Sequence, residues 1–329
     1  MNSRWHVNRS AKAGGTEMFI MARRGLLLGA LVGLLVPCVL AHGGQTCSRR
    51  ALVLCGHPGN DTYRQAYERS ARTIQRALTD RYAFAAEHVW VRAGTAPRTK
   101  DEPDWRGYRG PATREAIAAD VAELKRAAAP EDAVWVILIG HSHFDGRHVF
   151  VNLPGRDMDE TDFGKLFEGL KCREQVFFIT VPSSGFFIKH LSAKGRVVVT
   201  ATEADAEVNE ALFHAALADV LSDPPEPVQF DRDQDSRLTV LDLYLTAVRR
   251  VMHAYYDLHN IPTEHALLDD NGDGRGTELQ LDDLEPELGG RAMRRPLRVV
   301  IRSPADGALA ASIEVPGLRS FQQSSDNPR

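Results

Sequence analysis

Between residues 50 and 222, short apolar runs alternate with amphipathic segments. The apolar runs are too short for most helices and end at glycine or small polar residues, which is typical of strands that are covered on both faces. The segments between them carry apolar residues at helical spacing. The pattern predicts strands over 50–56, 87–91, 133–140, 175–180 and 196–202, and helices over 62–78, 112–129, 161–170, 185–193 and 209–221.

This alternation indicates an α/β domain with a mostly parallel sheet covered by helices on both faces. Ligands of such sheets gather at the carboxyl ends of the strands. In this chain those ends lie at 56–59, 140–143 and 180–185. Candidate chemistry is therefore expected in these three segments.

The pattern changes after residue 222. A proline-rich linker over 222–230 is followed by two acidic stretches, and a long amphipathic helix is predicted between them. We expect one domain over 42–222 and a small helical region over 223–290. Residues 291–329 are expected to add C-terminal strands and a disordered tail.

Residues 1–41 have the features of a secretory signal peptide. Arg23 and Arg24 precede an apolar run that closes on small residues at Ala41, and translation is expected to start at Met18 or Met21. An uncleaved anchor helix is the alternative, although the run is slightly short for one. The sequence thus predicts a secreted, periplasmic or cell-envelope protein, with no stable membrane span after processing.

Composition and cysteine content exclude two classes of protein: nucleic-acid-binding proteins and small disulfide-rich proteins. The formal net charge is −4, and no long basic block is present, so no nucleic-acid partner is expected. Cys47, Cys55 and Cys172 remain after removal of the leader. Three cysteines do not make a dense disulfide framework, and their pairing stays open. The core must therefore come from apolar packing.

Four motifs occur in the order found in one enzyme family: "VLCGHPGNDTYRQA", "DAVWVILIGHSHFDG", "VFFITVPSSGFFIKHL" and "RVVVTATEADAEVNE". Together they resemble the legumain-type cysteine peptidases of the caspase–haemoglobinase fold, over roughly 45–222. The resemblance implies a three-layer sandwich with the active site at the carboxyl ends of the strands. It also implies a peptide or protein as the ligand.

The resemblance carries over unevenly to the catalytic positions. His141 falls on the catalytic histidine, and Arg64 falls on the arginine of the substrate pocket. Pro182 stands where the family has its nucleophilic cysteine, and Pro58 stands where an asparagine orients the histidine. Proline offers neither a nucleophile nor an N–H group. The resemblance therefore favours a pseudopeptidase that binds a peptide or protein partner.

Two other chemistries remain open. A hydrolase of altered mechanism would use His141 with Ser183 or Ser184, because a serine beside an oriented histidine can be activated. A metal site would use His141 and His143 with His57 from the neighbouring strand end. Cys55 lies in a buried run, so we interpret it as a packed thiol.

The first acidic stretch has the ligand spacing of an EF-hand loop, with carboxylates at positions 1, 3, 5 and 12. Serine replaces glycine at position 6, and the Pro-rich entry suggests a loop–helix half-motif of the dockerin kind. The predicted calcium ligands are Asp231, Asp233, Asp235, the Arg237 carbonyl, Thr239 and Asp242.

The second acidic stretch repeats part of this spacing. Asp269, Asn271, Asp273 and the Arg275 carbonyl occupy positions 1, 3, 5 and 7, and Gln280 stands at position 12. Solvated Asp-rich turns are the alternative for both stretches. If calcium binds, the chain could also serve as a calcium-dependent structural module of a surface assembly.

Overall fold

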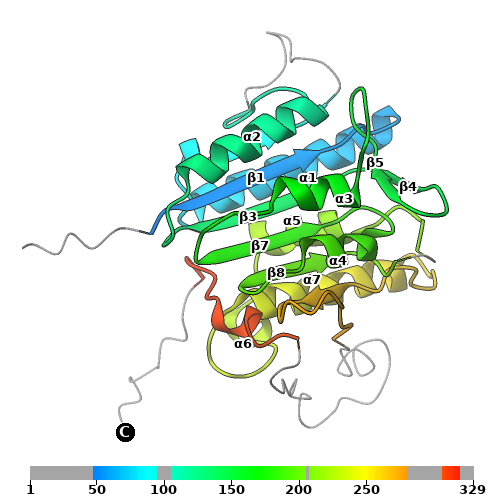
Figure 1. Cartoon of the computed structure of the whole chain (residues 1–329). Helices are drawn as coiled ribbons and strands as arrows, with labels where there is room; N and C mark the ends of the chain where they lie inside the picture. The colour runs from blue at the N-terminus through cyan, green and yellow to red at the C-terminus, as the bar shows by residue number, and fades with distance from the viewer. Residues whose placement is uncertain (1–46, 95–104, 205–206, 280–305, 319–329) are drawn as a thin grey trace, which may run out of the picture. The chain divides into compact units, whose positions relative to one another are not determined.

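The computed structural model describes residues 47–94, 105–204, 207–279 and 306–318 (Figure 1). The predicted signal peptide, the segment 291–305 and Gln280 lie outside these ranges. Within them, no helix combines the length and apolar character that crossing a membrane requires.

The described residues form a six-stranded sheet in which five neighbouring strands are parallel and the last is antiparallel. The predicted α/β class with a mostly parallel sheet is confirmed. In spatial order the strands are β2 (Val89–Arg92), β1 (Arg49–Cys55), β3 (Ala133–Ile139), β7 (Glu174–Ile179), β8 (Arg196–Thr200) and β9 (Leu267–Asp269).

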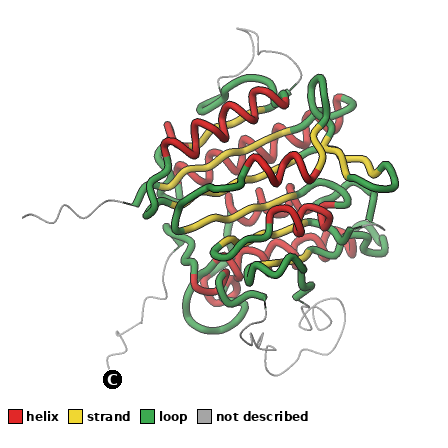
Figure 2. Tube along the Cα trace, in the orientation of Figure 1, coloured by secondary structure: helices red, strands yellow, loops and turns green. Residues whose placement is uncertain are grey.

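Helices cover both faces of the sheet, which makes three layers (Figures 1 and 2). One face packs against α1 (Asp61–Asp80), α5 (Phe213–Ser222) and α7 (Val240–Asp257). The other face packs against α2 (Arg114–Ala127), α3 (Glu160–Leu166) and α4 (Ile188–Leu191). The short helix α6 (Pro227–Phe230) places Phe230 in the first of these cores.

Strand β3 lies between the two cores and is buried along its whole length. Its side chains alternate between the faces, as strand geometry requires. The side chains of Trp135, Ile137 and Ile139 enter the core under α1, and those of Val134, Val136 and Leu138 enter the core under α2.

Several short elements were not predicted. A small antiparallel sheet is formed by β4 (Ser142–Phe144), β5 (Val149–Val151) and β6 (Met158–Asp159), whose strands are too short to give a periodic signal. The expected helix over 185–193 is a 3₁₀ turn, η2 (Ser184–Phe187), followed by the single turn of α4.

The described residues after 222 share the core of the main domain rather than forming a separate one. Helix α7 packs on α5, and β9 pairs antiparallel with β8 at the edge of the main sheet. The predicted boundary between 222 and 223 therefore does not separate two folded parts. Of the expected C-terminal strands, 306–318 instead form a 3₁₀ turn, η3 (Ala310–Ser312), and a single bridge from Glu314 to Thr239.

Helix α5 begins at Phe213, later than the predicted start at 209. The carboxylate of Glu264 accepts hydrogen bonds from the N–H groups of Leu212 and Phe213, at 2.7 and 3.2 Å. This long-range cap satisfies donors that a helix start leaves without a partner. Burial raises the pKa of Glu264 to about 7.

The amino-terminal edge of the sheet is held by a buried carboxylate. Asp132, just before β3, accepts hydrogen bonds from the N–H groups of Ser48 and Ala129, at 2.8 and 2.9 Å, and pairs with Arg50 at 3.5 Å. Burial acts to raise the pKa of Asp132, but these three partners outweigh it, so the pKa lies below its ordinary value.

We predict that Asp132→Asn lowers the free energy of unfolding at pH 7 by about 1–3 kcal/mol, because bonds to a charged acceptor are lost in a buried place. A lowered native pKa stabilises the fold above the unfolded pKa and loses that contribution as pH falls through the native pKa. The difference between wild type and variant is therefore expected to shrink in acid.

Urea unfolding at pH 7 and at pH 3 measures both effects. Glu131→Gln is the matched control, since Glu131 is the neighbouring acid and is only partly buried. Equal destabilisation by the two variants at pH 7 would contradict the prediction.

Candidate functional site

His141 lies at the carboxyl end of β3, where the sequence placed it. Its backbone carbonyl accepts a hydrogen bond from Asn152 at 3.0 Å. Two glycines allow the ends of β1 and β3 to meet here. A Cβ atom on Gly140, whose φ is 150°, would lie 3.1 Å from the nitrogen of Gly56. A Cβ atom on Gly56 would overlap the carbonyl of Asn152.

The imidazole of His141 is held by two side chains that the sequence did not single out. Its Nδ1 atom lies 2.6 Å from Glu210 Oε2 and 3.1 Å from the Tyr67 hydroxyl. Tyr67 also donates a short hydrogen bond to Glu210. Burial raises the pKa of Glu210, and these two partners act in the opposite direction. The three side chains form one polar cluster, the His141–Tyr67–Glu210 cluster.

Aromatic rings of α1 enclose this cluster. The ring of Tyr63 meets His141 edge to face, with centroids 4.4 Å apart, and the ring of Tyr67 lies 5.3 Å away. A Cβ atom on Gly59 would lie 3.6 Å from Cδ2 and 3.7 Å from Nε2 of His141, so Gly59 is next to this edge of the ring. The sequence could have indicated this arrangement, because Tyr63 and Tyr67 are four residues apart and residues i and i+4 share a helix face.

A second histidine lies behind Tyr67 in the core. His214 is 5% exposed, its ring is 5.2 Å from that of Tyr67, and its Nδ1 lies 2.9 Å from the Ser70 hydroxyl. Burial and the nearby His141 lower the pKa of His214 to about 4. The neutral imidazole is therefore the native form near pH 7.

The position that the resemblance assigns to the nucleophile offers no reactive group. Pro182 is buried, and its carbonyl accepts a hydrogen bond from the Ser142 hydroxyl at 2.6 Å. The Ser183 hydroxyl points to the Glu207 carbonyl at 3.4 Å. Ser183 also has a φ of 50°, a left-handed conformation that costs a non-glycine residue roughly 1–2 kcal/mol.

Ser184 links two strand ends rather than capping a helix. It is fully buried, its hydroxyl lies 3.0 Å from the Thr202 hydroxyl, and it accepts from Thr202 N at 3.1 Å. Among the described residues, the structure thus brings His141 to Tyr67 and Glu210 and gives both serine hydroxyls other partners.

The other residues that the sequence proposed for this site have partners of their own and do not join the His141–Tyr67–Glu210 cluster. Arg64 lies on the exposed side of α1 and pairs with Asp61 and Glu68, at 3.1 and 3.8 Å. His57 accepts a hydrogen bond from Gly59 N at 3.0 Å. His143 bonds Asn152 Oδ1 at 2.7 Å. Among the described residues, the histidines form no three-ligand cluster of the kind a metal requires.

Cys55 is a packed thiol, as expected from its place in a buried run. Its Sγ atom contacts the Tyr67 carbonyl at 3.7 Å, and burial raises its pKa far above the ordinary value. Such a thiol does not form the thiolate that nucleophilic attack requires.

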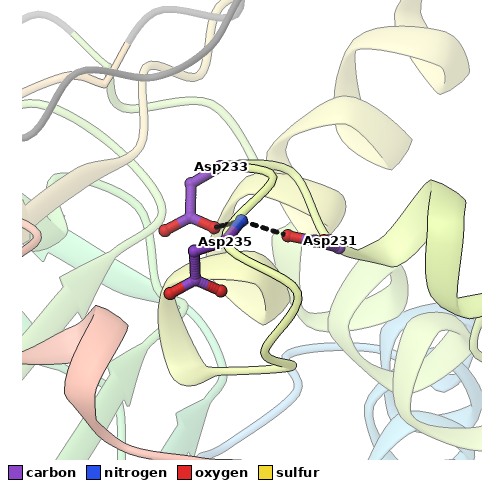
Figure 3. Close-up of side chains that lie close together, drawn as sticks. All are labelled: Asp231, Asp233 and Asp235. Atoms are coloured by element: carbon purple, nitrogen blue, oxygen red, sulfur yellow. Dashed lines mark hydrogen bonds between the residues drawn. The ribbon is translucent and has the colours of Figure 1, made fainter. Parts of the chain in front are cut away.

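Three carboxylates of the first acidic stretch converge (Figure 3). One ligand atom from each of Asp231, Asp233 and Asp235 lies within 4.8 Å of the others. Asp231 accepts hydrogen bonds from the N–H groups of Asp235 and Ser236, at 3.1 and 3.0 Å. Ser236 has a φ of 67°, the conformation that glycine would adopt most easily. We call this segment, 231–242, the Asp loop.

Repulsion within the Asp loop is substantial. Asp231 and Asp233 are both buried. Burial, followed by the charges of Asp242 and Asp235, raises the pKa of Asp233 to about 6. Like charges that share a buried place favour either protonation or a bound cation.

The other predicted ligands of the Asp loop have structural partners. Asp242 accepts hydrogen bonds from Arg232 N at 2.6 Å and from the N–H and hydroxyl of Thr239, at 2.9 and 2.8 Å. Thr239 and Asp242 thereby form a capping box at the start of α7. The side chain of Arg237 pairs with Glu314 at 3.2 Å, which leaves its carbonyl as the predicted ligand.

The second acidic stretch is a series of tight turns. Asp269 Oδ1 accepts from Gly272 N at 3.0 Å, Asn271 Oδ1 accepts from Asp273 N at 2.8 Å, and Asp273 Oδ1 accepts from Arg275 N at 2.8 Å. These contacts are common to Asp-rich turns with and without an ion. The second calcium loop stays a prediction.

No protein-family model matches this chain, and no curated protein matches it. The candidate sites therefore rest on the residues and their geometry.

We predict that His214 makes stability depend on pH. The native pKa of about 4 lies below the unfolded value near 6.5, so the unfolded state binds a proton that the native state excludes. The contribution of His214 to stability is full above pH 6.5 and falls as pH drops toward 4, by about 3 kcal/mol in all.

His214→Asn is expected to flatten this dependence, measured as the free energy of unfolding in urea at half-unit steps from pH 7.5 to 4. His259→Asn is the control, because His259 is exposed and asparagine tolerates its positive φ. If the free energy of unfolding of His214→Asn varies with pH as that of wild type does, groups other than His214 control this pH dependence.

Proposed function

We propose that this chain is an exported, catalytically inactive relative of the legumain-type peptidases that binds a peptide or protein partner and calcium. The observation that carries the first part is the closed nucleophile position. Pro182 stands there, and both following serine hydroxyls are bonded away from His141. The three-layer sandwich and the place of His141 at a strand end support the caspase–haemoglobinase resemblance.

A peptide ligand fits the edge of the sheet where the strands end. Parallel sheets covered by helices bind ligands at this edge, and His141, Tyr63 and Gly59 lie there together. Such a surface offers an aromatic ring, a ring nitrogen and exposed backbone. These groups hold an extended chain without cleaving it.

A hydrolase of altered mechanism is the second candidate, because one observation favours it. Glu210 lies against Nδ1 of His141, as an orienting carboxylate does in a catalytic triad. The pair supplies a base and its orienting group, and a water or substrate hydroxyl would have to provide the nucleophile. The peptidase assay below separates the two candidates.

The Asp loop fits a calcium ion in its donor set. Calcium takes oxygen ligands, mostly carboxylates and carbonyls, in flexible geometry. Asp231, Asp233 and Asp235 supply converging carboxylates, and two of them are buried with no cation to balance them among the described ion pairs. A bound ion would offset the burial and the repulsion that together raise the pKa of Asp233. We propose that its role is structural, as suits an exported protein.

We predict that the mature protein does not cleave peptides after asparagine or aspartate. Short fluorogenic peptides are incubated with the purified protein from pH 4 to 8, beside His141→Ala and Glu210→Gln. Equal background rates in all three proteins are expected, because no nucleophile is positioned at His141. Turnover that disappears in both variants would favour the hydrolase instead.

We also predict that calcium stabilises the fold through the Asp loop. At ten to one hundred times the dissociation constant, a ligand of the native state adds about 1–3 kcal/mol. Melting curves are recorded with calcium, magnesium and chelator for wild type and for Asp231→Asn/Asp233→Asn. Calcium is expected to raise the melting temperature of wild type but not that of the double variant.

The control for this experiment is Asp257→Asn, which removes an exposed acid at the far end of α7. It should retain the full calcium shift. If the double variant shifts as much as wild type, or wild type does not shift, the loop is only an acidic turn.

A further inference from the structure

The three cysteines that remain in the mature chain lie at opposite ends of the sheet. Cys55 ends β1 and is 2% exposed, whereas Cys47 precedes β1, Cys172 precedes β7, and both are partly exposed. All three are thiols in this structure. Eight residues of extended chain span about 26 Å, and a disulfide joins Cα atoms no more than about 7 Å apart. Cys55 is therefore out of reach of the other two, and the pairing of Cys47 with Cys172 remains.

The register of the sheet sets Cys47 and Cys172 at the same level. Arg49 pairs with Ala133, and Ala133 pairs with Glu174. Each cysteine stands two residues before the member of this row that belongs to its own segment. Strand β3 lies between β1 and β7, but it begins at Ala133. The strand between the two segments thus ends before the level of the two cysteines.

Side chains at this end of the sheet connect the two segments directly. Arg173, the neighbour of Cys172, places its Nη2 atom 3.5 Å from the Sγ atom of Cys47. Two residues further along each segment, Arg49 pairs with Glu174 at 3.1 Å, across the end of β3. Burial raises the pKa of the Cys172 thiol to about 12, and Cys47 adds a smaller contribution in the same direction. The two thiols are therefore close enough to interact.

We propose that Cys47 and Cys172 form a disulfide bond in the mature protein, which ties the start of β1 to the start of β7. Residues two strands apart in a sheet are separated by about 10 Å, so bond formation draws the two segments together by a few ångströms. Both cysteines lie outside the strands, so this movement breaks none of the pairs of the main sheet.

Formation of the bond is a thiol–disulfide exchange with an external disulfide, such as oxidised glutathione or the disulfide of an oxidoreductase. The thiolate of Cys47, beside the guanidinium of Arg173, attacks one sulfur of the oxidant and releases the other as a thiolate. Cys172 reacts second, because its raised pKa keeps it a thiol. It loses its proton and attacks the Cys47 sulfur, which displaces the second thiol. Two cysteine thiols are oxidised, and one external disulfide is reduced to two thiols.

The bond would close a loop that contains β1, α1, β2, α2 and β3. A disulfide stabilises chiefly by restricting the unfolded chain, and the effect grows with the length of the loop. We expect the oxidised protein to melt roughly 5–10 °C above the reduced protein. Disulfides persist in exported proteins and are rare where thiols are kept reduced, so the presence of this bond in the cell rests on the export in the proposed function.

Mass spectrometry of the mature chain, residues 42–329, tests the bond directly. The protein is equilibrated in glutathione buffers from reducing to oxidising. Its thiols are alkylated with one reagent before unfolding and with a second reagent afterwards, and the chain is then digested. A peptide containing Cys47 linked to a peptide containing Cys172 is expected in the oxidising buffers. Cys55 is expected to carry the second reagent, because it is buried in the folded protein.

Cys47→Ser and Cys172→Ser are each expected to abolish the linked peptide. Each is also expected to abolish the difference in melting temperature between oxidised and reduced protein. Both variants replace a partly exposed sulfur and are expected to fold. Cys55→Ala is the control, and it should retain the linked peptide and the difference in melting temperature.

Three results would overturn the proposal. They are the absence of the linked peptide at every glutathione ratio, a linked peptide that contains Cys55, and linkage only between two chains, seen as a dimer on a non-reducing gel. Because the bond forms in buffer, this outcome does not depend on export. Protein that forms the bond in buffer but keeps its leader peptide in the cell would count against the proposed export alone.

Discussion

Burial of β3 on both faces is the constraint on which the rest of the structure depends. All seven of its residues are buried, and it pairs in parallel with β1 on one side and β7 on the other. A strand in that position needs a helical layer above and below, so α1 and α2 must cover opposite faces. The same pairing fixes the register of the strand ends, which brings Gly140 beside Gly56 and Ser142 against Pro182, with His141 between these two contacts along the chain.

The carboxylates at the two ends of the strands have pKa values shifted in opposite directions. At the amino-terminal edge, Asp132 has enough donors to lower its pKa, and it acts as a structural anchor. At the carboxyl-terminal ends of the strands, Glu210 is partly buried with fewer donors, and desolvation gives it a raised pKa. The difference separates a carboxylate whose charged form is stabilised by the fold from one whose charged form is disfavoured by it. Protein folds commonly concentrate such electrostatic cost at sites of function.

Local signals explain which parts of the structure could be predicted. The strands of the main sheet from β1 to β8 are continuous apolar runs, and the Asp loop follows a spacing within twelve residues, so both were visible in the sequence. The antiparallel β9 and the β4–β6 sheet have two or three residues per strand, too few for periodicity. Glu210, His214 and Glu264 acquire their roles from partners 51 to 144 positions away, which no local pattern reports. The apolar pattern placed His141 just after the end of a strand, but it did not show that Tyr67 and Glu210 would contact it.

The capping box at the start of α7 has a consequence for motion. Asp242 accepts at once from Thr239, which begins the helix, and from Arg232 within the preceding loop. If either segment unfolds, a hydrogen bond between Asp242 and the other segment is broken. The loop and the first turn of α7 are therefore expected to exchange their amide hydrogens with solvent as one cooperative unit, rather than as a mobile loop attached to a rigid helix.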